Sequence, residues 1–179
     1  MSIQKDSMGK PHEARTLEVI AQEVANGFIH RLAPAFRPPA RLTCPSDEAE
    51  QVVVDTVTLV AAARGIAVEQ IDLRPASAER LDAITARLNE GHDSQDCDID
   101  SSPPVLLILR GFDVFGDENH DAPTYPFRSL FQFTQTYLWL FVGRDAARMS
   151  FLFSNYRRPL YQAAADITPE DWRPAKQLR

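Results

Sequence analysis

The sequence predicts one α/β domain built in three layers, with helices on both faces of a mostly parallel sheet of about five strands. Residues 105–109 form an unbroken apolar run, too short to span a membrane and too uniformly apolar for a half-exposed strand. Segments of strand and helix character alternate over residues 41–109, an order that gives parallel strands with right-handed crossovers. The length of 179 residues, 44% of them hydrophobic, supplies one full core rather than two.

The first element expected is an amphipathic helix from His12 to about Leu32. Its apolar residues recur at helical spacing and form one stripe: Leu17, Ile20, Val24, Phe28 and Leu32. The segment Pro34–Pro39 contains three prolines, which predicts the end of the helix and a linker. We therefore divide the chain into residues 1–40, a helix with its linker, and residues 41–179, the α/β domain. The apolar stripe must be buried on this domain or on another protein.

The next elements expected are a strand at 41–44, a helix at 47–64, a strand at 66–73 and a helix at 76–89. Asp47, Glu48 and Glu50 lie in the first turn of the second helix, where the helix dipole favours acids. Gly65 is placed to end that helix.

An acidic loop at 90–102 leads into the strand at 105–109, which we expect at the centre of the sheet. The remaining elements expected are a polar loop at 115–122, an aromatic helix at 125–137, a strand at 138–142, a helix from 143 to about 164 and a short strand at 166–168. Arg110–Asp113 follow the central strand at its carboxyl end, where open α/β sheets place ligand sites. These residues read as a polar, flexible turn.

Charge and cysteine content limit the function classes. The net charge of −6 and a pI near 5.2 argue against a free-standing, high-affinity nucleic-acid binder, because phosphate binding depends on clustered Lys and Arg. A local basic patch stays open. Cys44 and Cys97 form no CxxC pair, which favours a reducing compartment. The first ten residues lack the apolar region of a signal peptide, and no stretch is apolar enough to span a membrane. We expect a cytoplasmic protein.

The strand that runs into Arg110-Gly111-Phe112-Asp113 resembles a P-loop NTPase core of the AAA+ or NACHT-like kind. In that family a turn of the form Asp-Gly-aromatic-Asp handles magnesium and water. The resemblance covers the order of elements from residue 41 to about 170 and implies an AAA+-like core without the helical lid. Arg110 replaces the first acid of the turn and has no lone pair for a cation, so only Asp113 remains.

The family's phosphate loop would lie between the first strand and the second helix. Set against G-x-x-x-x-G-K-[ST], the two glycine positions hold Cys44 and Ala49, the lysine position holds Glu50 and the hydroxyl position holds Gln51. The acids of this stretch would each repel a triphosphate by about 1 kcal/mol. We predict no phosphate binding here, and we assign the chain no cofactor.

Two further features are similar to AAA family ATPases. Gly143-Arg144 ends a strand like the sensor-one strand, and in that family the following helix leads towards an arginine finger. Arg157 and Arg158 match the position of that finger. The alternative is that they are exposed arginines at a helix end, interacting with its dipole.

The loops at 90–102 and 113–121 are rich in acids and also contain His92, Cys97 and His120. Their spacing fits neither an EF-hand nor a zinc site, and no G-x-S-x-G supports a serine triad. We interpret them as solvated loops without a metal.

The function predicted is that of a non-catalytic regulatory or scaffold subunit with an ATPase-like fold. Its partner would be a protein, either a related active ATPase or a second copy of the chain. The candidate partner contacts are Arg110, Asp113, Phe127, Phe131, Arg144, Arg157 and Arg158. Two alternatives stay open: a nucleotide- or metal-dependent hydrolase using Asp113 and the acidic loops, and an accessory factor of a nucleic-acid-processing machine.

Overall fold

A computed structural model describes residues 15–30, 39–75, 77, 83–84, 86, 105–116, 124–125, 127–129 and 137–173. Its helices are α1 (Leu17–His30), α2 (Asp47–Ala62) and α5 (Ala146–Ser154), with short 3-10 turns η1 (Phe112–Phe115) and η3 (Glu170–Trp172). Its strands are β1 (Ala40–Thr43), β2 (Ala67–Asp72), β3 (Val105–Arg110), β4 (Tyr137–Gly143) and β5 (Ala165–Asp166).

The five strands form one sheet in the order β2-β3-β4-β1-β5, and every neighbouring pair is parallel. This confirms the predicted α/β class and strand count. The strand expected at the centre, β3, is buried from Leu106 to Leu109, but β4 occupies the middle of the sheet and is buried from Leu138 to Gly143. The burial of β3 was predicted correctly and its central place was not, because strand order depends on pairing between distant segments.

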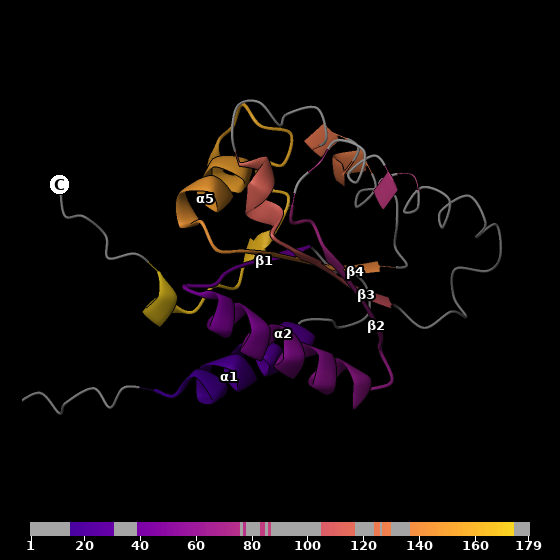
Figure 1. Ribbon diagram of the computed structural model, residues 1–179, viewed down its shortest axis with the longest axis vertical. Helices are drawn as coiled ribbons and strands as arrows, with labels where there is room; N and C mark the ends of the chain where they lie inside the picture. Colours follow the sequence, from indigo (N-terminus) through magenta and orange to yellow (C-terminus); the bar gives the residue numbers. More distant parts are fainter. Residues whose placement is uncertain are drawn as a thin grey trace, which may run out of the picture.

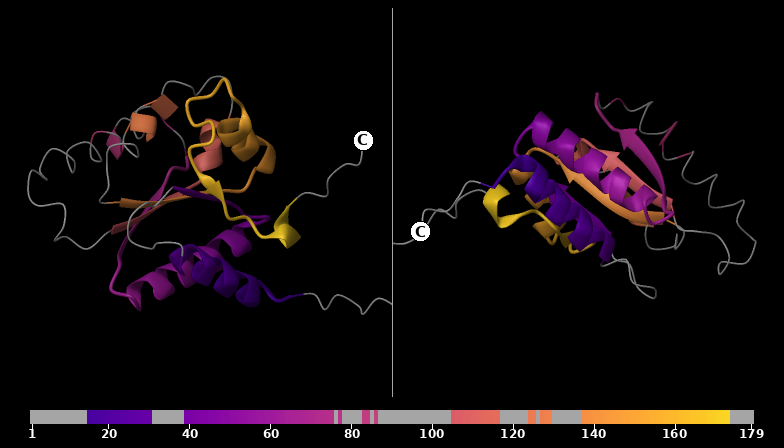
Figure 2. Two further views of the ribbon diagram at one scale, coloured as in Figure 1. Left: turned by 180° about the vertical axis from the view of Figure 1, so that it is seen from behind. Right: turned by 90° about the horizontal axis from the view of Figure 1, so that it is seen from below.

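The helices cover both faces of the sheet. Helices α1 and α2 lie side by side on one face, while α5 and η1 lie on the other (Figures 1 and 2). The three-layer arrangement is therefore confirmed.

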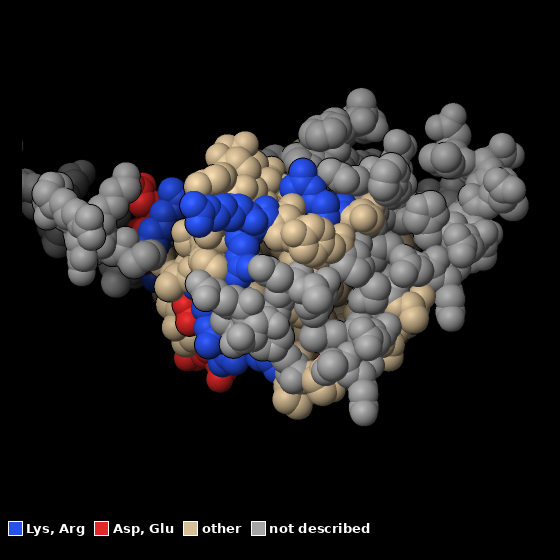
Figure 3. Space-filling model, turned by 90° about the horizontal axis from the view of Figure 1, so that it is seen from above, with Lys and Arg blue, Asp and Glu red and all other residues tan. Residues whose placement is uncertain are grey.

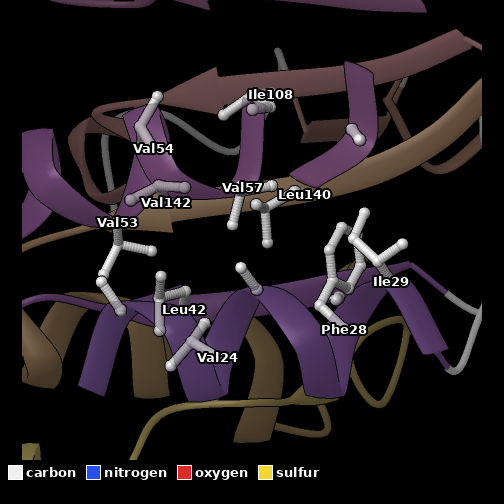
Figure 4. Close-up of a cluster of buried hydrophobic side chains, with 14 of the residues drawn as sticks. Val24, Phe28, Ile29, Leu42, Val53, Val54, Val57, Ile108, Leu140 and Val142 are labelled. Atoms are coloured by element: carbon white, nitrogen blue, oxygen red, sulfur yellow. The ribbon is translucent and has the colours of Figure 1, made fainter. Parts of the chain in front are cut away.

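The core on the α1–α2 face joins α1, α2 and the sheet. Figure 4 shows Phe28 of α1, Val53 and Val57 of α2 and Leu140 of β4 within one cluster of buried side chains. The described residues of the amphipathic stripe, Leu17 to Phe28, thus pack against α2 and the sheet, while Leu32 lies outside the described residues. Burial of each such side chain contributes about 1.5–3 kcal/mol, which explains how a helix of 14 residues is held in place.

The core on the α5 face is aromatic. Phe112 packs with its ring centroid 4.5 Å from that of Phe141 and 5.7 Å from that of Phe127. Phe112, Phe115 and Phe127 are all fully buried. The turn after β3 is therefore anchored by two phenylalanines instead of being a flexible polar turn, and Phe127 has no exposed surface to offer a partner.

Helix α5 ends ten residues earlier than the sequence pattern suggests. It stops at Ser154, and Asn155 is already extended. Pro159 has no N–H group and disfavours helical backbone at the residue before it, Arg158, so a helix could not run to residue 164. The chain already leaves the helix at Asn155, whose Oδ1 accepts a hydrogen bond from the N–H of Arg157 over 3.1 Å and forms a turn. Residues 155–164 form turns, and Gln162 has a positive φ of 54° while its N–H donates to the carbonyl of Phe153 over 3.0 Å.

Some expected features lie outside the described residues. These are the prolines at 34 and 38 of the linker, most of the helix at 76–89, the acidic loop at 90–102, residues 117–122, Phe131 and the C-terminal tail from 174. Within the described ranges, no helix has both the length and the apolar character needed to cross a membrane.

Candidate functional site

The carboxyl ends of the parallel strands meet beside the N-terminus of α2. The register pairs Asp72 with Arg110, Arg110 with Val142, and Thr43 with Gly143. The residues that follow the strands therefore gather at one edge of the sheet, as expected for an open α/β fold. Three of them are arginines: Arg74, Arg110 and Arg144.

The connection from β1 to α2 is short. β1 ends at Thr43 and α2 begins at Asp47, so only residues 44–46 lie between them. The Ser46 hydroxyl accepts a hydrogen bond from the N–H of Ala49 over 3.1 Å and caps the helix. Residues 47–51, which fall on the last five positions of the phosphate-loop pattern, are already helical. The described backbone therefore forms no extended loop to cradle a phosphate.

Glu50 is fully buried at this edge, although it lies in the first turn of α2. Arg74 donates from Nη2 to Oε1 over 2.6 Å and from Nη1 to Oε2 over 3.2 Å. Arg110 donates from Nε to Oε1 over 2.7 Å, and Arg144 Nε lies 3.4 Å from Oε2. An unpaired buried carboxylate would cost several kcal/mol, so these guanidinium groups are what permit its burial.

Each outer arginine also has a second carboxylate. Asp72 accepts from Nε of Arg74 over 2.9 Å and from its Nη2 over 3.1 Å, while Asp47 pairs with Nη1 of Arg144. Partial burial raises the pKa of Asp72, but the hydrogen bonds from Arg74 outweigh it and hold that pKa below its ordinary value. The same hydrogen bond with Asp72 is the main cause that raises the pKa of Arg74. We call the three arginines with Asp47, Glu50 and Asp72 the Glu50 cluster; its formal charges cancel.

Gly111 gives the cluster room. Its φ of 68° is in the left-handed region, and a Cβ atom on this residue would lie 2.6 Å from Cγ of Arg74. The Arg74 side chain therefore rests against the Gly111 backbone on its way to Glu50. A larger residue would have to displace it.

Asp113, the acid that remains from the family's turn, accepts a hydrogen bond from the backbone of the same chain. Its Oδ2 accepts from the N–H of Asp145 over 3.1 Å, at the start of α5, and its buried Oδ1 has no hydrogen-bond partner among the described residues. Across all the described residues, no three His, Cys, Asp or Glu side chains lie close enough together to hold a metal ion. The contact to Asp145 joins η1 to the start of α5.

Cys44 lies beneath the cluster and is fully buried. Burial raises the pKa of its thiol to about 12, and the nearby Glu50 carboxylate adds to the shift. A thiol in this setting stays protonated and is a poor nucleophile.

The remaining candidate partner contacts are four arginines, of which two lie at Glu50 and two follow α5. Arg110 and Arg144, proposed as partner contacts, are bonded to Glu50, with side-chain exposures of 19% and 35%. Arg157 is exposed, whereas Arg158 is buried with its guanidinium 3.9 Å from the centroid of the Phe151 ring. The expectation of two exposed helix-end arginines is therefore wrong for Arg158.

The sequence interpretation missed Glu50 and Arg74 as site residues. Glu50 was interpreted as an ordinary acid of a helix start, and Arg74 was not singled out. A usable signal was present, because an arginine follows each of three expected strands, at positions 74, 110 and 144.

No protein-family model matches the chain, and no curated protein is similar enough to be matched. Solved structures do match. A Walker-type ATPase of Pyrococcus abyssi matches with a TM-score of 0.52 and 10% identity, over 83% of this chain and 51% of that one. The Orc1 protein of Aeropyrum pernix, solved in complex with DNA, matches with a TM-score of 0.54 and 11% identity, over 92% of this chain and 47% of that one.

The chain thus spans about half the length of each of these two proteins. At such low identity the likeness establishes the fold alone. The parallel five-stranded sheet with helices on both faces, together with these matches, shows that the chain has the α/β fold of Walker-type, AAA+-like ATPases.

Proposed function

We propose that this chain is a non-catalytic, ATPase-like regulatory or scaffold subunit that acts through protein–protein interaction. The observation that carries the proposal is Glu50, buried under Arg74, Arg110 and Arg144 where the family pattern has its phosphate-binding lysine.

Phosphoryl transfer needs a phosphate cradle with its lysine, a carboxylate for magnesium and a positioned water. Here α2 begins where the cradle would be, and Glu50 stands in place of the lysine. Arg110 stands in place of the first magnesium carboxylate and binds Glu50. Since the cluster's formal charges cancel, a nucleotide phosphate would have to break existing ion pairs to bind its arginines.

A fold of this kind still offers packed helices and loop surfaces for recognition when it performs no chemistry. The partner proposed is a related active ATPase or a second copy of the chain. Affinity purification of the tagged full chain from its native cells, followed by mass spectrometry, identifies the partner.

Isothermal titration of the intact protein with ATP and Mg²⁺ tests the non-catalytic assignment. We expect no saturable heat up to millimolar ATP and no phosphate release above the buffer background. Glu48→Gln, purified in the same way, is the matched control, because Glu48 is an exposed neighbour of Glu50 in the same helical turn and its replacement should leave the titration unchanged. Saturable binding in the micromolar range would overturn the proposal and support the hydrolase alternative.

A further inference from the structure

The α5 side of the molecule is locally basic although the chain is acidic. Residues 124–129 and 146–164 contain four arginines and no aspartate or glutamate, in a chain whose net charge is −6. Figure 3, which views this side, shows arginine side chains spread across the face and acids towards its edge. Two acids border these segments: Asp145 pairs with Arg148 at 3.6 Å, and Asp166 pairs with Arg41 at 3.2 Å. The positive charge of the segments themselves favours an acidic partner.

Exposed tyrosines lie in the same segments. Of the five large hydrophobic side chains that are exposed in the described part of the chain, three are Tyr125, Tyr156 and Tyr161. We call these tyrosines, together with Arg157, the tyrosine–arginine surface. Tyrosine offers a large contact area at a low entropy cost, because few torsions must be fixed.

The backbone that carries this surface is fixed by two other arginines. Arg128 donates from Nη1 to the carbonyl of Pro159 over 2.7 Å and to that of Tyr161 over 3.3 Å. It thereby joins the segment of Tyr125 to the turn of Tyr156 and Tyr161. Arg158 stacks on the Phe151 ring and holds the turn against α5. A surface that is already ordered loses little entropy on binding.

Arg157 is oriented by its neighbour. Its Nε donates to the hydroxyl of Tyr156 over 3.0 Å, and its guanidinium carbon lies 5.4 Å from the centroid of that ring. Neither of its two Nη groups donates to another described residue, and the side chain is exposed. The free pair of Nη groups has the geometry that binds a carboxylate with two parallel hydrogen bonds.

We propose that the tyrosine–arginine surface binds an acidic segment of a protein partner that also carries an aromatic or apolar side chain. A partner carboxylate pairs with the Nη groups of Arg157, and the tyrosines contact the adjacent apolar group. Tyr and Arg are the residues enriched at energetically dominant positions of protein interfaces. This inference rests on the proposed function and gives its interaction surface a chemical specificity.

A protein segment fits this surface better than a nucleic acid does. Strong, salt-dependent binding to DNA draws on about 6–10 phosphate contacts. Of the four arginines in these segments, Arg128 is bonded to backbone carbonyls and Arg158 is buried. Arg148 pairs with Asp145 at 3.6 Å, which leaves Arg157 as the exposed guanidinium with no acidic partner among the described residues. One exposed cation among tyrosines matches a carboxylate next to an apolar residue.

Fluorescence anisotropy on the intact protein tests the inference with three labelled probes: a random copolymer of glutamate and tyrosine, poly-glutamate, and oligo-thymidine. We expect the copolymer to bind most tightly. Arg157→Glu should weaken copolymer binding at least tenfold, and Tyr156→Ala should weaken it several-fold. Arg64→Glu is the matched control, because Arg64 is an exposed arginine just after α2, on the opposite side of the sheet, and should leave binding unchanged.

Two results overturn the inference. One is copolymer binding that is absent or unaffected by Arg157→Glu; the other is tighter binding of oligo-thymidine with a steep salt dependence, which points to nucleic acid. The ATP titration is independent of this experiment. If ATP binds and the copolymer also binds, the proposed function is wrong and the inference about the surface stands. If neither ATP nor the copolymer binds, only the inference about the surface is wrong.

Discussion

Arg110 at the end of β3 donates from Nε to Oε1 of Glu50 in the first turn of α2 over 2.7 Å. These two residues occupy the positions where the family pattern has a magnesium-binding acid and a phosphate-binding lysine. Arg110 stands at the position of the acid, and Glu50 stands at the position of the lysine. The two residues therefore still carry opposite charges and attract each other. This ion pair holds the first turn of α2 directly against the end of β3.

Replacing Glu50 should destabilise the protein strongly. Glu50→Gln leaves three arginines facing one another without their shared carboxylate, and we expect the free energy of unfolding to fall by about 3 kcal/mol or more. Urea denaturation followed by circular dichroism measures this. Glu48→Gln, two residues earlier and exposed, should change the value by less than about 0.5 kcal/mol. Equal urea midpoints for the two variants would show that the cluster contributes nothing.

The Asp72–Arg74 pair predicts a dependence of stability on pH. The folded-state pKa of Asp72 lies below its ordinary value of 3.8, so its contribution is fully present above pH 3.8 and is lost as the pH falls further. The difference in unfolding free energy between the wild type and Asp72→Asn should therefore be largest above that pH and shrink in more acidic solution. Thermal unfolding over an acidic pH series measures it, and a constant difference would contradict this assignment.

Two adjacent arginines should behave differently. Arg158→Ala removes a buried guanidinium that stacks on Phe151 at 3.9 Å, and we expect a loss of about 2 kcal/mol in unfolding free energy. Arg157→Ala removes an exposed side chain and should change stability by less than about 0.5 kcal/mol. Chemical denaturation of both variants makes the comparison. A larger loss for Arg157→Ala would invert the assignment of surface and core.

Two glycine substitutions should have opposite signs. Gly111→Ala places a Cβ at positive φ and 2.6 Å from the Arg74 side chain, and should cost about 1–3 kcal/mol. Gly27→Ala lies inside α1, where a Cβ meets nothing within 4 Å, and should stabilise the fold by about 0.5–1 kcal/mol. Differential scanning calorimetry measures both shifts in midpoint. A raised midpoint for Gly111→Ala would be incompatible with the left-handed backbone and the Arg74 contact described here.

Cys44 should resist alkylation in the native protein. Its thiol is buried, and its pKa is raised to about 12, so almost no thiolate is present at mildly alkaline pH. Peptide mapping after treatment with iodoacetamide should find Cys44 unmodified in the native protein and fully modified in guanidinium chloride. Rapid native modification would mean that the edge near Glu50 opens in solution.

The sequence by itself determined the elements whose signal is local. The apolar runs at 105–109 and 138–142 predicted β3 and β4, because strands buried on both faces need apolar residues throughout. The stripe of α1 and the start of α2 at Asp47 were predicted for the same kind of reason, since helical spacing and the acids of a first helical turn act within a few residues. From these elements the parallel α/β class followed.

Only the tertiary structure decided what surrounds Glu50. Its partners Arg74 and Arg110 lie 24 and 60 residues away in the sequence, and they reach it because parallel strands end at one edge of the sheet. Position in the sequence suggested a solvated helix-start acid, while burial by three distant arginines made it the centre of a closed cluster. Contacts between segments that are distant in the sequence also explain why β4 lies in the middle of the sheet and why Arg158 is buried. Local periodicity shows which side chains are apolar. Long-range contacts decide which charged side chains can be buried.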